Sequence, residues 1–290
     1  MESPGKQGPG IQKGWLRVVV FCFCFAGIVI LGSGLYAWIS KRLELPEQLK
    51  FFLGFVVLFL LSLLAVLIFR RWVDRASFIS LGFPFKHYRR DALIGFLLAI
   101  VLLAIESLVL FYTGHLVWTG INFQPADLFT GMLIMIMVAI SEEAVFRGYI
   151  LHNLMQSLNK WIALAITSLL FALFHAFNPN IDALALVNIF LSGFVMGLNY
   201  VYTGNLWFAI MFHFSWNFFL GPILGFEVSG VPLASLLEQE VEGPRWLTGG
   251  EFGLEGSAMD GLLSIITFLL LYQPMKRLAA PHLANSPNNV

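Results

Sequence analysis

Eight long apolar stretches dominate the sequence and leave little choice of fold class. A helix needs about 20 apolar residues to cross the hydrocarbon core of a bilayer. Candidate stretches occupy 15–39, 51–69, 92–113, 128–150, 161–177, 183–203, 206–224 and 260–273, of which the fifth and eighth are short. Only 12% of the 290 residues are charged and 58% are hydrophobic, whereas soluble domains carry about 25% charged residues. We therefore predict an all-α, polytopic membrane protein with about eight transmembrane helices in a bundle.

The basic residues of the short loops predict the orientation of this bundle, because cytoplasmic loops are enriched in Lys and Arg. If the N-terminus is cytoplasmic, the opposite side receives only Lys41, Arg42, Lys50 and Arg245 of the chain's 17 basic residues. We predict a multi-pass protein of the bacterial plasma (inner) membrane with both termini in the cytoplasm. A disordered cytoplasmic tail (1–14) precedes a single transmembrane domain (15–275), and a second cytoplasmic tail (276–290) follows it.

Other features of the sequence exclude some classes of protein. Lys+Arg and Asp+Glu number 17 each, so no excess of positive charge suggests a nucleic-acid partner. Cys22 and Cys24 lie two positions apart, which places them on nearly opposite sides of a helix, so they cannot share a metal ion. The loop 225–259 is acidic and rich in glycine, and we interpret it as a solvated loop.

A few ionisable residues interrupt the apolar stretches. A charge at mid-membrane costs about 2.5–3.5 kcal/mol on insertion scales, so each such residue is a candidate for function. The set comprises Glu106, Glu142, Glu143, Arg147, His175 and His213, with Asn217 as a polar companion. A single His or Asn within a membrane more often bonds neighbouring helices than catalyses a reaction. For Glu106, a cavity-lining role and a structural role both stay open.

The stretch SEEAVFRG (141–148) holds three of these charges. Glu143 and Arg147 are four residues apart, so they share a helix face and can pair. Glu142 lies about 100° around the helix from Glu143 and is left without that partner. We therefore predict that Glu143 and Arg147 support the site, and that Glu142 acts as a general base.

The spacing of the helices predicts which residues meet Glu142. The fourth and fifth segments turn at 157–160, and Glu142 and His175 are equally far from the centre of that turn. In an antiparallel hairpin they lie at the same height, about 25 Å from the tip. His213 lies about 13 Å beyond the turn at 203–205, and Asn217 follows one helical turn deeper. The four residues can converge in a cytoplasm-facing cavity, which independent structural residues would not need to do.

Three motifs now point to a known family. EEAVFR (142–147), FALFH (171–175) and HFSWN (213–217) resemble, in order, the EExxxR, FxxxH and HxxxN motifs of the CPBP intramembrane proteases. This family contains CAAX endoproteases and bacteriocin-processing proteins. The resemblance covers a catalytic core of about 128–220, and it implies an endopeptidase that hydrolyses a peptide bond within the membrane.

The resemblance also implies roles for individual residues. Glu142 and His175 would activate a water molecule, His213 and Asn217 would stabilise the oxyanion, and Glu143 and Arg147 would support them. We favour a reaction without a metal cofactor, since the chain has no HExxH motif. A zinc ion held by Glu142, His175 and His213 is the alternative, because three protein ligands and a water describe a catalytic zinc site.

The implied partners are membrane lipid and a peptide or protein substrate, either a lipidated CAAX-like tail or another membrane-associated segment. Two other functions compete with the protease. A non-catalytic scaffold or bacteriocin-immunity protein of the same fold would have no need to retain Glu142. A proton-coupled transporter would require polar residues along the outer halves of the helices, where the sixth and seventh segments offer only Asn188.

Overall fold

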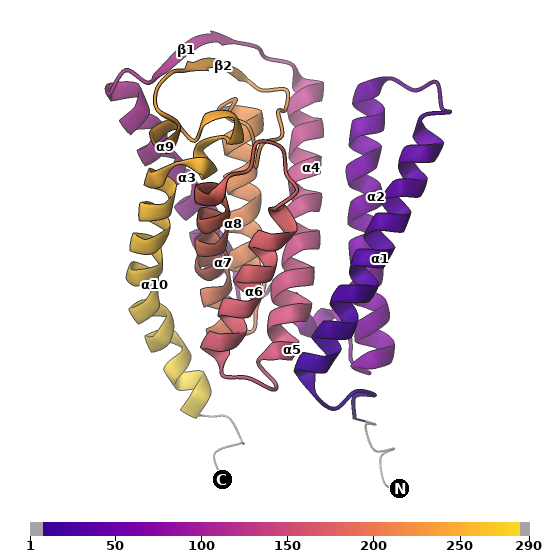
Figure 1. Ribbon diagram of the computed structural model, residues 1–290. Coiled ribbons are helices and arrows are strands. Elements are labelled where there is room, and N and C mark those ends of the chain that lie inside the picture. The colour runs from indigo at the N-terminus through magenta and orange to yellow at the C-terminus, as the bar shows by residue number, and fades with distance from the viewer. Residues whose placement is uncertain (1–7, 285–290) are drawn as a thin grey trace, which may run out of the picture.

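The computed structural model describes residues 8–284 and is built almost entirely of helices (Figure 1). The all-α membrane class is therefore confirmed. The long helices are α1 (Gly14–Ser40), α2 (Glu47–Ile68), α3 (Arg89–Tyr112), α4 (Pro125–Glu143), α6 (Lys160–His175), α7 (Ala183–Thr203), α8 (Trp207–Phe218) and α10 (Ala258–Ala284). The shorter elements are η1 (Phe69–Val73), η2 (Phe78–Leu81), η3 (Ala144–Leu151), α5 (His152–Leu154), η4 (Phe219–Ile223), α9 (Arg245–Thr248), η5 (Gly250–Phe252) and η6 (Leu254–Gly256).

Each of the eight predicted segments is helical, but only six helices in the described part of the chain are long and apolar enough to cross a membrane. The six include α4, which continues through η3 and α5 as one helix from Pro125 to Leu154. The other two are α6, with 16 residues, and α8, with 12 residues before η4. Both are shorter than the roughly 20 residues of a typical span. The predicted count of eight spans is therefore not confirmed.

The predicted tails are described only in part. Residues 1–7 and 285–290 lie outside the described residues. Within the first tail, the Gly10 amide donates a hydrogen bond to the Val73 carbonyl oxygen (2.8 Å). Within the second, α10 continues to Ala284, well beyond the predicted end of the last span. Part of each predicted tail is thus ordered against or within the helical body.

Local sequence signals fix the helix ends near the predicted site. Pro125 begins α4, where its fixed φ and missing N–H cost nothing. The Asn159 side chain accepts from the Trp161 amide at the start of α6, and the Asp182 side chain accepts from the Ala185 amide at the start of α7. Gly204 ends α7 with a φ of +61°, a conformation that favours glycine. These caps set the tight connections on which the positions of His175 and His213 depend.

A two-stranded antiparallel sheet closes one end of the bundle and was not predicted. Strand β1 (Leu116–Ile121) pairs with β2 (Leu237–Val241), with Leu116 opposite Val241 and an irregularity between Trp118 and Gly120. The sheet ties the connection between α3 and α4 to the loop 225–259. The interpretation of that loop as solvated was wrong: besides β2 it contains α9, η5 and η6, and Phe252 and Leu254 are fully buried.

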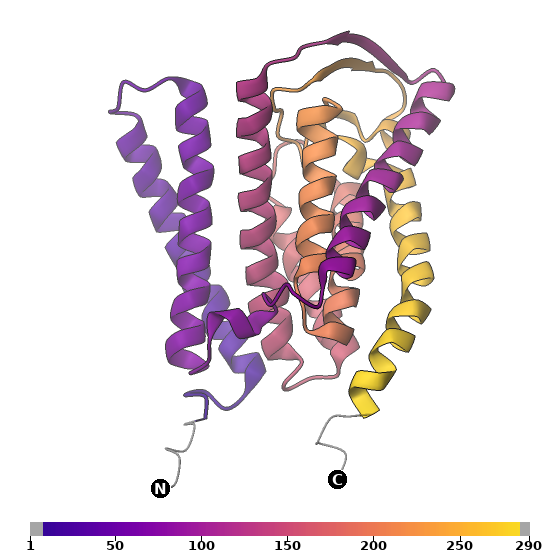
Figure 2. The ribbon, with the colours of Figure 1, turned by 180° about the vertical axis from the view of Figure 1, so that it is seen from behind.

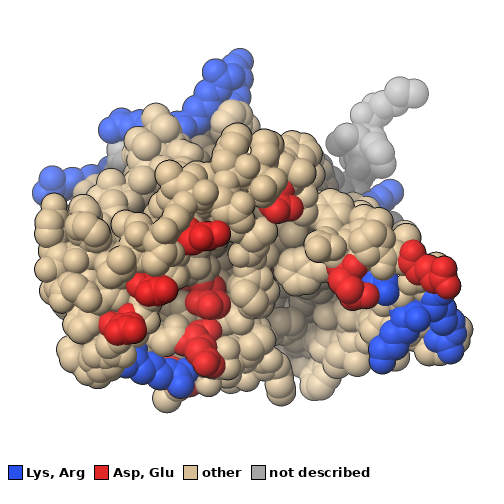
Figure 3. All heavy atoms as spheres, turned by 90° about the horizontal axis from the view of Figure 1, so that it is seen from above, with Lys and Arg blue, Asp and Glu red and all other residues tan. Residues whose placement is uncertain are grey.

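The start of α1 and the end of α10 lie at the end of the bundle opposite the sheet, as both ribbon views show (Figures 1 and 2). We call these the terminal end and the sheet end. Seen from the sheet end, Asp and Glu are spread across the surface, while Lys and Arg lie mainly near its margins (Figure 3). That both termini lie on the cytoplasmic side of a membrane stays a prediction.

A buried polar network at the terminal end joins the α1–α2 hairpin to the rest of the bundle. Asp74 accepts from Arg17 (3.2 Å) and Arg70 (2.8 Å), and all three side chains are almost fully buried. Tyr149 and Asn153, which follow the SEEAVFRG stretch, donate to the same carboxylate. One carboxylate thus holds two helices against the helix that carries Glu142.

We expect Asp74→Asn to destabilise the protein strongly, because it leaves two buried guanidinium groups without their counter-charge. Removing one member of a buried ion pair costs about 3–5 kcal/mol. Thermal unfolding in detergent, followed by tryptophan fluorescence, measures this loss. Glu47→Gln is the matched control, because Glu47 pairs with Lys50 at the surface (2.8 Å) and such pairs contribute about 0–1 kcal/mol. Equal melting temperatures for the two variants would contradict the proposed role of Asp74.

Candidate active site

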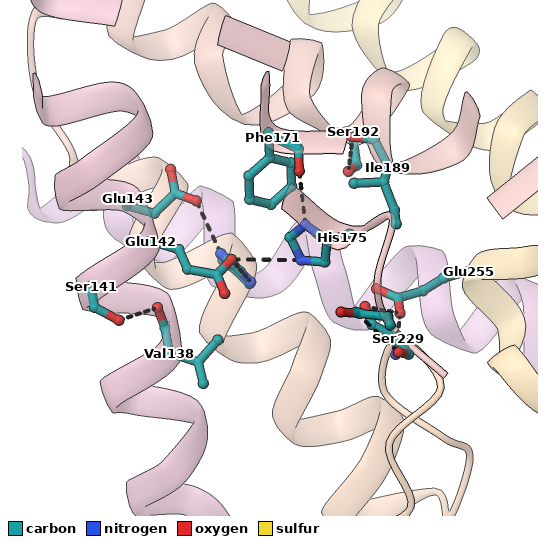
Figure 4. A network of polar contacts seen from close by, with 12 residues as sticks. Val138, Ser141, Glu142, Glu143, Phe171, His175, Ile189, Ser192, Ser229 and Glu255 are labelled. Atoms are coloured by element: carbon teal, nitrogen blue, oxygen red, sulfur yellow. Dashed lines mark hydrogen bonds and ion pairs between the residues drawn. The ribbon is translucent and has the colours of Figure 1, made fainter. Parts of the chain in front are cut away.

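Glu142 occupies the centre of the predicted constellation (Figure 4). Its Oε2 atom lies 3.9 Å from Nε2 of His175 and 3.9 Å from Nε2 of His213. This oxygen is buried and has no hydrogen-bond partner among the described residues. Three polar atoms from three helices thus face one small space, at separations that a single water molecule can bridge.

The hairpin geometry brings Glu142 and His175 together as the spacing predicts. α4 with its continuation and α6 run antiparallel on either side of the turn after Leu154, and the two residues lie at equal distances from it. His213 approaches on α8, which starts at the terminal end with Trp207. The convergence of these three side chains is therefore present in the folded chain.

Hydrogen bonds on the far side of each imidazole fix its orientation. Nδ1 of His175 lies 2.9 Å from the carbonyl oxygen of Phe171, and Nδ1 of His213 lies 3.0 Å from Oε1 of Glu143. Both partners are oxygen acceptors, so each Nδ1 carries the proton and donates it. The Nε2 atoms of both rings are consequently directed to Glu142, with a lone pair available when the ring is neutral.

Glu143 and Arg147 form the predicted ion pair. Nη1 of Arg147 donates to Oε1 of Glu143 at 2.7 Å, and both side chains are 0% exposed. Nη2 of Arg147 donates to the Gly193 carbonyl oxygen (3.3 Å), and the guanidinium lies 4.5 Å from the centre of the Phe171 ring. Because Oε1 of Glu143 also accepts from His213, the pair positions an imidazole as well as compensating buried charge.

The helix widens where this pair lies. α4 ends at Glu143, and the next eight residues, Ala144–Leu151, form a π-helix. Such wide turns are rare and often lie at functional sites. The widened turn holds Arg147 in the interior, while Glu142, one residue before Glu143, faces the cavity.

Asn217 lies on the same face of α8 as His213, one helical turn further along. Its side chain is buried, lines the same cavity as Glu142, and makes no hydrogen bond within the described part of the chain. An unpaired amide in this position can donate to an oxygen atom of a bound substrate. The structure thus brings together all four residues that were predicted to act in catalysis.

The cavity in front of Glu142 has a volume of about 330 Å³ and mainly apolar walls. The α1–α2 hairpin, outside the predicted catalytic core, supplies one wall through Phe25, Val29, Phe55 and Phe59. At the sheet end, Leu233 also lines a second hollow of about 740 Å³ beneath the tip of the hairpin. The two spaces therefore share Leu233 as part of their walls.

Loops at the sheet end contribute to the wall of the cavity. The described lining includes Asn178, Val228, Ser229, Val231 and Leu233 from these loops, and none from the loops at the terminal end. The depth of a residue in a helix does not reveal on which side the space around it opens, so the cytoplasm-facing cavity stays a prediction.

Two large aromatic residues also line the cavity. They are Phe171 and Trp216, and the Phe171 ring contacts His175, His213 and Arg147. Glu255 lines it too, although it belongs to the loop interpreted as solvated. Glu106 is 0% exposed and does not line this cavity.

The donor atoms around Glu142 are poorly spaced for a metal ion. A tetrahedral zinc with bonds of about 2.0–2.1 Å separates its ligand atoms by about 3.3 Å, less than the 3.9 Å found at both imidazoles. Among the described residues, no group of three His, Cys, Asp or Glu side chains could hold a metal ion. Glu142, His175 and His213 would need to move closer together to bind zinc.

We expect Arg147→Met to destabilise the protein by about 3–5 kcal/mol, because Glu143 would remain as an uncompensated buried charge. The double variant Glu143→Gln/Arg147→Met should be more stable than Arg147→Met alone, since it removes both charges. Thermal unfolding in detergent compares them, with exposed Lys86→Met as control. If the double variant is as unstable as the sum of both single variants, Arg147 does not act by compensating Glu143.

Comparison with known proteins agrees with the motifs. Residues 124–219 match the family model described as "Rce1-like: Type II CAAX prenyl endopeptidase Rce1-like". No curated protein and no solved structure matches the chain. The matched range contains Glu142, His175, His213 and Asn217 and nearly coincides with the predicted core. The resemblance to the CPBP intramembrane proteases is therefore confirmed over residues 124–219, the part of the chain that matches this family model.

Proposed function

We propose that this protein is an intramembrane endopeptidase in which Glu142 and His175 activate a water molecule. The observation that carries the proposal is the buried, unpaired Oε2 of Glu142, which faces two imidazole Nε2 atoms at 3.9 Å. A buried acceptor without a partner is costly. A water molecule bound between Glu142 and His175 would remove this cost and lie ready for reaction.

In the proposed reaction, the water oxygen attacks the scissile carbonyl carbon while Glu142 takes a proton from the water. The carbonyl oxygen becomes an oxyanion, which His213 and Asn217 stabilise by donating hydrogen bonds. The C–N bond then breaks, and the proton passes from Glu142 to the leaving amine. General base catalysis of this kind contributes about 10²–10⁴-fold to a rate.

The role of His213 sets a condition on its charge. Its Nδ1 proton is already donated to Glu143, so a hydrogen bond to the oxyanion requires a second proton on Nε2. Glu143 would stabilise the resulting imidazolium, much as a buried carboxylate does in a serine protease triad. This role gives a reason for the hydrogen bond between Glu143 and His213 beyond packing.

The distribution of basic residues supports a cytoplasmic terminal end. With this orientation, a substrate enters from the sheet end or from lipid. The apolar cavity walls favour a membrane-associated peptide segment. A C-terminal CAAX-like tail, with or without a lipid, is one candidate for such a segment.

We expect purified protein in lipid vesicles to cleave one or more peptides from a panel that includes prenylated C-terminal sequences. Glu142→Gln should lower the cleavage rate by about 10²–10⁴-fold, because the general base is lost. Asn217→Ala should lower kcat by about 10²–10³-fold with little change in KM, because it removes an oxyanion donor. Mass spectrometry of the products identifies the cleaved bond.

The matched control is Glu240→Gln, which removes an exposed carboxylate from β2 at the sheet end and should leave the rate unchanged. Parallel reactions with a chelator test the zinc alternative. Cleavage that is unaffected by Glu142→Gln would refute the proposed mechanism. If wild-type protein cleaves no peptide of the panel, the non-catalytic scaffold or immunity function gains support.

The orientation predicts which residues can be labelled from outside intact cells. In a Cys22→Ser/Cys24→Ser background, we expect a membrane-impermeant maleimide to label Glu240→Cys on intact cells stripped of any outer membrane. We expect it to label His87→Cys, at the exposed terminal end, only after the membrane is opened. The reverse pattern would place the cavity mouth in the cytoplasm.

A further inference from the structure

The catalytic cavity has a second polar region that the proposed reaction does not use. Glu255, Asp260 and Ser264 line it near the sheet end, together with Ser229. In Figure 4, Glu255 and Ser229 lie on the opposite side of His175 from Glu142. Glu255 lies in η6, whereas Asp260 and Ser264 lie in the first turns of α10. The loop 225–259 and the last helix therefore build this part of the wall.

Glu255 is held firmly in place. Its Oε1 accepts from Nε1 of Trp216 (3.1 Å), and its Oε2 accepts from the amide (2.7 Å) and hydroxyl (2.8 Å) of Ser229. Trp216 is one helical turn from His213, so the carboxylate is fixed relative to the catalytic helix. The glycines of this loop allow the fold: Gly249 and Gly253 have positive φ, and a Cβ on either would clash with a backbone carbonyl group.

Asp260 and Ser264 are different, because neither side chain has a partner. They are 5% and 8% exposed, share one face of α10 and both line the cavity. Neither side chain makes a hydrogen bond or ion pair within the described part of the chain. The backbone amide of Asp260, by contrast, donates a hydrogen bond to the hydroxyl oxygen of Ser257. Two buried, unpartnered polar groups directed into one cavity are available for a ligand.

Acidic side chains gather in this part of the molecule, and the described cavity lining brings no basic side chain to them. Asp260 and Glu255 are the electrostatic neighbours of Glu106, and both carboxylate oxygens of Glu106 are buried without a partner. No Lys or Arg is among the described residues that line the cavity. Buried carboxylates are costly without a counter-charge, so a ligand that brings a positive charge gains more here than a neutral one.

The geometry points to an organic cation rather than a metal ion, since no three acidic, His or Cys side chains among the described residues are arranged to hold a metal. We propose that Asp260, Glu255 and Ser264 form a subsite that binds a Lys or Arg side chain of the substrate peptide. This inference rests on the proposed function. It names the substrate class as an apolar segment with a basic residue near the scissile bond.

The test measures binding, so that it does not depend on turnover. Glu142→Gln protein in phosphatidylcholine nanodiscs is titrated with fluorescent hexapeptides that are apolar and blocked at both ends. The peptides form matched pairs, one pair for each position of the hexapeptide. One member of a pair has Lys at that position, and the other has norleucine there. At one position we expect Lys to bind about tenfold more tightly than norleucine, since tenfold corresponds to about 1.4 kcal/mol.

Asp260→Asn and, separately, Glu255→Gln should remove most of this preference, whereas Glu240→Gln, an exposed acid at the same end, should leave it unchanged. Melting temperatures show whether each variant is folded. Ser264→Ala is a milder change in the same subsite and should reduce the preference for Lys by less than the acid variants do. Equal binding of Lys and norleucine peptides, no binding of either, or a preference that survives both acid variants would overturn the inference. Failure of the proposed function is seen separately, as cleavage unaffected by Glu142→Gln.

Discussion

The buried chain Arg147–Glu143–His213 is the interaction on which the site depends. Glu143 and Arg147 are fully shielded from solvent, where neither charge could remain without the other. The remaining hydrogen bond from Nδ1 of His213 turns the other ring nitrogen to Glu142. Phe171 packs against Arg147 and both imidazoles. The ion pair between Glu143 and Arg147 thus compensates buried charge and fixes the His213 ring. Oε2 of Glu142 makes no hydrogen bond to any described residue.

Two different kinds of contact build the cavity around this chain. The helices of the family core supply the polar residues, whereas the α1–α2 hairpin supplies an apolar wall. The hairpin is attached at the terminal end through Asp74 and its two arginines. At the sheet end, a hollow separates its tip from α4. The apolar wall of the cavity is thus attached through the buried network at the terminal end only.

Much of the site was predictable because helices convert sequence spacing into height and direction. The i, i+4 spacing predicted the ion pair between Glu143 and Arg147, and equal distances from one turn predicted that His175 meets Glu142. The contacts of Phe171 and Trp216 were not predictable in this way. Large aromatic residues are equally common in cores, in membrane-interface belts and around sites, so their type does not indicate their neighbours.

The sequence by itself determined the membrane class, the helical segments and the set of catalytic candidates, since hydrophobic length and helical periodicity are local properties. Only the tertiary structure decided which loops line the cavity and that Glu255 turns inward to join Asp260 in its wall. The loop 225–259 looked solvated because acidic residues and glycines are typical of exposed loops. Its burial results from pairing with β1 and packing against distant helices, and contacts between distant segments leave no local pattern in the sequence.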